Sequence, residues 1–105
     1  MIDLPPHLAS DTYLPRIVAT VREAMGGTPS RAFLFGSRAT GRARIGSDYD
    51  IALDSEQGIE RQIRRAMGAL ETSTIPFMVD LVDLAVADAE FRAKALREGI
   101  VLWTE

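Results

Sequence analysis

The segment 48–54 constrains the fold of this chain more than any other part of the sequence. In an extended strand, successive side chains point to opposite faces of the sheet. Ile51 and Leu53 then share an apolar face, whereas Asp48 and Asp50 point together from the other face. A strand of this kind packs one face against a hydrophobic core and leaves carboxylates on the other face, where they can bind a ligand. Tyr49 lies on the apolar side and is expected to be a core residue.

Apolar periodicity predicts the elements on either side of this strand. Helices are expected over residues 12–25, 37–41, 59–70 and 88–98. Strands are expected over residues 32–35, 48–54 and 77–82, and residues 100–103 read as a strand or a packed tail. Residues 1–10 are expected to form a flexible leader, because Pro5 and Pro6 oppose regular structure.

Composition excludes several classes of function. A chain of 105 residues that is 47% hydrophobic has the size and apolar content of one globular domain. It has no cysteine, which excludes thiolate metal sites and fits a cytoplasmic location. No apolar run approaches the roughly 18 residues of a membrane span. The net charge of −3 argues against strong nucleic-acid binding, and the single histidine, His7, gives little support for histidine-based catalysis.

Paired carboxylates on one strand face indicate a metal site. Asp48 and Asp50 stand about 7 Å apart along a strand and repel each other, and a bound Mg²⁺ would remove that cost. Asp80 lies among apolar neighbours in the strand 77–82, which indicates an interior aspartate that needs a partner or a metal. The alternatives are a solvated strand start for the pair and a polar rim for Asp80. Asp54 and Asp83, at strand ends, are interpreted as ordinary surface carboxylates.

Gly36 and Ser37 follow the apolar run 32–35 and open a predicted helix, where backbone N–H groups can bind a triphosphate. Gly36 and Gly41 also have the glycine spacing of a P-loop. That alternative is rejected, because Arg42 and Ala43 stand where a P-loop requires lysine and a hydroxyl residue.

Arginines cluster between this turn and the carboxylates. Arg38, Arg42 and Arg44 all lie between Gly36 and Ser47, and the guanidinium group suits bidentate phosphate contact. At least one of the three is expected to bind phosphate, with Arg38 and Arg42 as the candidates. The alternative is that they are solvated side chains of an arginine-rich sequence.

The ordered strings 35–41 and 47–51 resemble the signature of the DNA polymerase β-like nucleotidyltransferase superfamily, and within it the minimal nucleotidyltransferases. Residues 76–84 and 91–102 are similar to the C-terminal part of that family. The resemblance implies an α/β (α+β) fold with a small mixed sheet flanked by helices, as a single domain over residues 1–105. It implies that Gly36 and Ser37 bind triphosphate, that Asp48 and Asp50 hold Mg²⁺, and that Asp80 is the third acidic residue.

The same resemblance implies a function. The chain is expected to transfer AMP from ATP to a hydroxyl on a partner protein, releasing pyrophosphate. Because it ends soon after the minimal catalytic unit, the acceptor is expected to come from another molecule, in a homo- or hetero-oligomer. Such members pair with an all-helical HEPN protein, here expected from the adjacent gene, as the antitoxin of its toxin. The alternatives are a non-catalytic module that regulates a HEPN-like partner by contact, and transfer to an aminoglycoside or an RNA end.

Overall fold

Four strands form one mixed sheet in the computed structural model, which describes residues 4–44 and 46–104. In the order β3-β2-β1-β4, the strands are β3 (Val79–Asp83), β2 (Tyr49–Asp54), β1 (Arg31–Phe35) and β4 (Ile100–Trp103). β1 pairs antiparallel with both β2 and β4, whereas β2 and β3 are parallel. The expected mixed sheet is therefore confirmed, and residues 100–103 are a strand rather than a packed tail.

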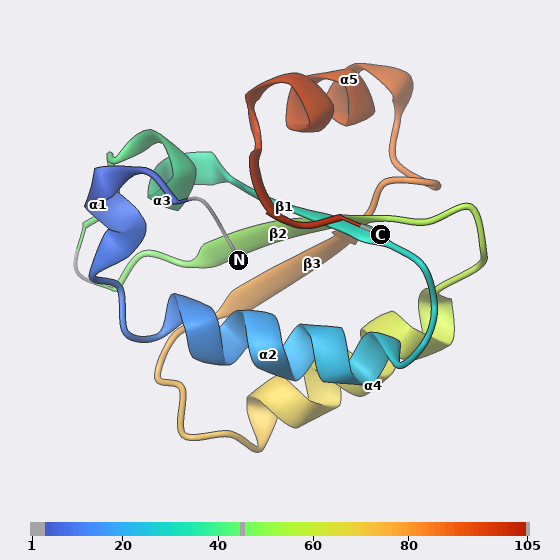
Figure 1. The fold of residues 1–105 in the computed structure, drawn as a ribbon, viewed down its shortest axis with the longest axis horizontal. Coiled ribbons are helices and arrows are strands. Elements are labelled where there is room, and N and C mark those ends of the chain that lie inside the picture. The colour runs from blue at the N-terminus through green and yellow to red at the C-terminus, as the bar shows by residue number, and fades with distance from the viewer. Residues whose placement is uncertain (1–3, 45, 105) are drawn as a thin grey trace.

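Helices cover both faces of this sheet (Figure 1). α2 (Leu14–Met25) and α4 (Glu60–Glu71) lie together on one face, and α5 (Ala89–Glu98) lies on the other. α4 also supplies the crossover that the parallel pair β2 and β3 requires. Two short helices complete the fold, α1 (Pro6–Ala9) and α3 (Gly36–Thr40). None of the described helices has the length and apolar character needed to cross a membrane.

Strand β2 lies between two hydrophobic clusters, as its alternation predicts. Ile51 and Leu53 are fully buried in the larger cluster, under α2 and α4. Ala52 belongs to the smaller cluster under α5, together with Phe33 of β1. At 25 cal/mol per Å² of apolar surface, each fully buried aliphatic side chain contributes about 1.5–3 kcal/mol, so this strand is held firmly from both sides.

The N-terminal segment departs from the expected leader. Pro6–Ala9 forms α1, and Leu8 is buried in the larger cluster. The expectation that the prolines oppose regular structure is wrong here, because Pro6 occupies the first turn of the helix, where its missing N–H has no partner to lose. Residues 1–3 of the expected leader lie outside the described residues.

Element boundaries shift by one or two residues. β3 begins at Val79, so Phe77 and Met78 precede the strand that was expected to include them. Asp48 lies just before β2, not within it. The helix expected over 12–25 is present as α2, and the Asp11 carboxylate accepts from the Tyr13 and Leu14 amides at 2.9 and 3.0 Å. The Asp11 side chain therefore satisfies two backbone N–H groups at the start of α2.

Candidate active site

The turn from β1 into α3, formed by Gly36 and Ser37, contacts the carboxylate of Asp50 directly. Gly36 has a φ of +75°, a backbone conformation that favours glycine. A Cβ atom on Gly36 would lie 3.2 Å from Asp50 Cγ and would overlap Asp50 Oδ2. The absent side chain is therefore what allows the Gly36-Ser37 turn and the carboxylate to share this space.

The register of β2 and β3 brings Asp50 and Asp80 side by side. The two residues are paired across the parallel strands, so their side chains lie on the same face. Asp50 is half-buried, whereas Asp80 is exposed. Burial raises the pKa of Asp50, and the neighbouring charges of Asp80 and then Asp48 raise it further. Asp50 is therefore close enough to Asp80 and Asp48 to be repelled by both.

Asp80 does not have the interior position expected from its apolar neighbours. It is exposed because β3 is the edge strand of the sheet, where only one neighbouring strand is present. Asp48 is exposed as well, just before β2. Asp50 alone of the three is partly withdrawn from solvent.

These carboxylates suit a metal that brings ligands of its own. Within residues 4–44 and 46–104, no group of three or more His, Cys, Asp or Glu side chains could hold a metal ion. Mg²⁺ commonly binds through one or two carboxylates, with substrate phosphates and waters completing its octahedron. The mutual repulsion at Asp50 is the charge environment that such a cation would relieve, so the residues present fit Mg²⁺ bound together with a triphosphate.

The predicted phosphate ligands next to the turn differ in their contacts. The Ser37 carbonyl accepts from the Arg42 amide at 3.0 Å, which closes the loop after α3. The Arg42 side chain is exposed, and no hydrogen bond or ion pair engages its guanidinium within the described parts of the chain. The guanidinium of Arg38, by contrast, donates to the Ser47 carbonyl from Nε at 3.2 Å and from Nη2 at 2.8 Å. Phosphate binding by either arginine stays a prediction, and Arg42 is the better placed for it.

Tyr49 holds β2 from the face opposite the carboxylates. Its side chain is 1% exposed, which confirms the expected core position. Its hydroxyl donates to Asp11 Oδ2 at 2.8 Å, a contact that the sequence did not predict. Burial, and next the hydrogen bond to Asp11, raises the pKa of Tyr49. The phenol therefore stays neutral and tethers β2 to the start of α2.

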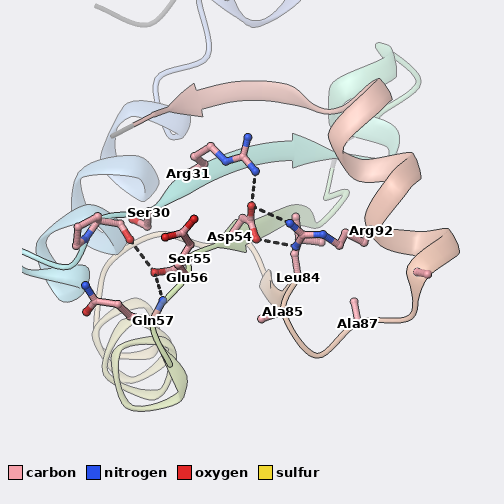
Figure 2. A pocket seen from close by; sticks show the side chains of 12 residues that line it. Ser30, Arg31, Asp54, Ser55, Glu56, Gln57, Leu84, Ala85, Ala87 and Arg92 are labelled. Carbon is pink, nitrogen blue, oxygen red and sulfur yellow. Dashed lines mark hydrogen bonds and ion pairs between the residues drawn. The ribbon is translucent and has the colours of Figure 1, made fainter.

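A second polar cluster lies at the far end of β2. Asp54 was expected to be an ordinary surface carboxylate, but it is 7% exposed and is bound by two arginines (Figure 2). Arg92 of α5 donates from Nη1 to Asp54 Oδ1 at 2.7 Å, and Arg31 of β1 contacts Oδ2. The Arg92 hydrogen bond is the main cause that lowers the pKa of Asp54, and the same contact raises the pKa of Arg92.

This cluster lines a pocket of about 930 Å³, which also includes Ser55 and Gln57. The pocket is separate from the Gly36-Ser37 turn, because Asp54 lies about 13 Å along β2 from Asp50 at 3.3 Å per residue. No local signal in the sequence marks the cluster. Asp54 receives its partners from β1 and α5, which only the tertiary fold brings to the end of β2.

Comparisons with known proteins agree on the family. The family model described as Polymerase beta, Nucleotidyltransferase matches residues 22–105. A protein of Haemophilus influenzae named "Probable protein adenylyltransferase MntA" is 41% identical over 59 residues, which are 55% of this chain and 52% of that protein. The match thus spans about half the length of that curated relative.

Two solved structures share the fold. One is the crystal structure of a toxin–antitoxin with AMP-PNP, which matches 87% of this chain and 73% of that chain with a TM-score of 0.72 and 25% identity. The other is a mutant of the toxin–antitoxin MntA-HpeT, which matches 87% of this chain and 72% of that chain with a TM-score of 0.69 and 22% identity. The α/β fold with its mixed sheet is therefore that of known nucleotidyltransferase structures.

Proposed function

Because the chain belongs to the polymerase beta nucleotidyltransferase family, we propose that it transfers AMP from ATP to a hydroxyl group of a partner protein. The observation that carries this proposal is the contact between Gly36 and Asp50. It places a turn suited to a triphosphate against a carboxylate suited to a divalent cation. Neither half of the site can bind its ligand without bringing that ligand close to the other half.

Each residue of the site has a task in the proposed reaction. Gly36 and Ser37 cradle the triphosphate, and Arg42 contacts it from the exposed loop. Asp48 and Asp50 hold Mg²⁺ with help from Asp80. When bound, the metal neutralises charge on the phosphates and lowers the pKa of the attacking hydroxyl.

The reaction balances as a substitution at the α-phosphorus of ATP. The acceptor oxygen forms a new bond to that phosphorus, and the bond to the bridging oxygen of the β-phosphate breaks. Pyrophosphate leaves with the electron pair of that bond. The proton of the acceptor hydroxyl passes to Asp80, which is exposed on the edge strand beside Asp50 and can accept it.

The proposed acceptor is a toxin protein. Both similar solved structures are toxin–antitoxin assemblies, and the curated relative is named as a protein adenylyltransferase. We extend these likenesses to an all-helical HEPN-like partner encoded by the adjacent gene, with this chain as the antitoxin. A cytoplasmic location, expected from the cysteine-free sequence, belongs to the same proposal.

A transfer assay tests the reaction. The chain is incubated with Mg²⁺, α-labelled ATP and the product of the adjacent gene, and label on the partner is measured. Asp50→Asn removes the half-buried charge with little change in shape and is expected to abolish labelling. Asp83→Asn is the matched control, because Asp83 lies on β3 with Asp80. Its Oδ1 accepts a hydrogen bond from the Ala85 amide, and asparagine retains an oxygen that can accept the same bond.

One observation favours a second function. Because the described residues contain no preformed three-ligand metal cluster, the chain could act as a module that regulates its partner by contact alone. Unlabelled partner, together with partner inhibition that survives Asp50→Asn, would establish that function and exclude the transferase.

A further inference from the structure

Arg38 links the two halves of the candidate site through its side chain. It belongs to α3, the short helix that begins at Gly36, and its guanidinium reaches the segment before β2. There it makes a forked pair of hydrogen bonds to the Ser47 carbonyl, from Nε at 3.2 Å and from Nη2 at 2.8 Å. Ser47 immediately precedes Asp48 in the sequence. One side chain therefore joins the Gly36-Ser37 turn to the start of the carboxylate segment.

Two aromatic rings set the direction of that guanidinium. The Arg38 Cζ atom lies 4.2 Å from the centroid of the Tyr49 ring and 5.0 Å from that of Phe77. The two rings meet edge to face, with centroids 5.6 Å apart. A planar guanidinium over such rings gains cation–π attraction of about 0.5–2 kcal/mol. The rings thus hold the guanidinium plane where its fork meets the Ser47 carbonyl.

The backbone of Arg38 is held from a third direction. His7 of α1 donates from Nε2 to the Arg38 carbonyl at 3.0 Å. Tyr49 in turn is tied to Asp11, at the start of α2. His7 thus contacts Arg38 directly, whereas Asp11 holds the Tyr49 ring that the Arg38 guanidinium contacts.

We propose that Arg38 is a positioning residue that fixes the spacing between the Gly36-Ser37 turn and the Asp48–Asp50 carboxylates, and that it is not a triphosphate ligand. The proposal rests on the proposed function, because the spacing matters only for a triphosphate and a metal bound together. A ligand for triphosphate would direct its N–H fork at the turn. Arg38 directs that fork at a backbone carbonyl, with its Cζ atom over the rings of Tyr49 and Phe77.

The dependence of ATP affinity on Mg²⁺ separates a positioning residue from a phosphate ligand. A positioning residue affects the coupling between ATP and Mg²⁺, so Arg38→Gln leaves ATP affinity without metal within twofold of the parent. The increase in affinity on adding Mg²⁺ then falls about tenfold, the size expected for losing a charged hydrogen-bonded pair. A phosphate ligand gives the opposite pattern, an equal loss with and without Mg²⁺, and that result would overturn the proposal.

A charge-conserving variant sharpens the comparison. Arg38→Lys keeps the positive charge but loses the planar fork of the guanidinium. We expect it to lose Mg²⁺ coupling nearly as completely as Arg38→Gln, whereas parent-like coupling in this variant would show that charge alone is needed. Arg61→Gln is the control, because Arg61 is exposed on α4, on the opposite side of the molecule from α3 (Figure 1).

Hydrogen exchange tests the same inference without nucleotide. The Tyr49 amide donates to the Met78 carbonyl at 2.9 Å, at the point where β2 joins β3. Arg38→Gln is expected to raise exchange of this amide at least about fivefold, while amides of α4 stay at parental rates. Unchanged exchange at Tyr49 would refute the positioning role. Because this result does not depend on catalysis, it separates failure of this inference from failure of the proposed transferase.

Discussion

Replacing Gly36 with alanine tests the contact between the Gly36-Ser37 turn and Asp50. The new Cβ would overlap Asp50 Oδ2 and would also sit on a residue with a φ of +75°. Gly41 provides a matched control at the other end of α3. Its φ is +77°, and a Cβ there would lie 3.8 Å from the nearest His7 atoms, which is ordinary van der Waals contact. The two substitutions share backbone strain and differ in the clash.

The expected costs follow from these two terms. A left-handed conformation costs a non-glycine residue about 1–2 kcal/mol, and the stiffer unfolded chain returns about 0.4–1 kcal/mol, so Gly41→Ala should lose about 1 kcal/mol. Gly36→Ala adds an overpacking cost of about 1–3 kcal/mol if the backbone gives way. Gly36→Ala is therefore expected to lower the unfolding free energy by about 2–4 kcal/mol in total. If Asp50 rotates away instead, the stability loss stays near that of Gly41→Ala and the proposed metal ligand is misplaced.

Thermal melts with and without Mg²⁺ and ATP measure both consequences. A ligand at 100 times its Kd stabilises the native state by about 2.7 kcal/mol, which raises the Tm of a domain this size by about 10–20 °C. We expect the parent and Gly41→Ala to keep this ligand-induced shift and Gly36→Ala to lose it. A Gly36→Ala protein that keeps the full shift would show that the turn and Asp50 do not form one site.

Three further variants test charges and hydrogen bonds at Asp50, Asp54 and Ser30. Because burial, and next the charges of Asp80 and Asp48, raise the pKa of Asp50 in the native state, ionised Asp50 opposes folding above that pKa. Metal-free Asp50→Asn should therefore gain roughly 1 kcal/mol in urea unfolding at pH 7, the size of a charge pair a few ångströms apart in water; a loss of stability would contradict this direction. The pKa of Asp54 is lowered, so its ionised form stabilises the fold at pH values above the unfolded-state pKa near 4. This stabilisation is lost as the pH falls through the native pKa. Asp54→Asn should therefore cost about 2–3 kcal/mol of unfolding free energy at pH 7 and progressively less in acid. A cost that is constant with pH would exclude the ion pair with Arg92 as its source. Ser30→Ala leaves the buried Trp103 Nε1 without its acceptor at 3.1 Å and should cost about 1–3 kcal/mol by chemical denaturation, whereas a neutral result would mean that water replaces the hydroxyl.

Most of the fold could be predicted from local patterns. The alternation in β2 predicted which side chains meet the core, and Ile51 and Leu53 are buried as expected. The sequence did not predict α1, because Pro5 and Pro6 were expected to oppose any helix. Pro6 occupies the first turn of α1, where proline is tolerated.

The candidate site was only partly predictable. Alternation in a strand predicted Asp48 and Asp50 on one face, but only Asp50 lies in β2, and Asp48 lies just before it. The sequence could not show that Asp80 is exposed, since that depends on β3 being the edge strand. It also could not assign Arg38 its contacts, because the Ser47 carbonyl and the Phe77 ring reach it from other parts of the chain.

The sequence by itself determined which groups this protein has for chemistry: a Gly-Ser pair after an apolar strand, and aspartates in and beside the next strand. The tertiary structure decided how close these parts lie and which charges are neutralised. Only the folded chain brings Gly36 against Asp50 and buries Asp54 between Arg31 and Arg92. Local backbone geometry is encoded residue by residue, whereas burial and charge pairing depend on strand order and on helices that arrive from distant sequence.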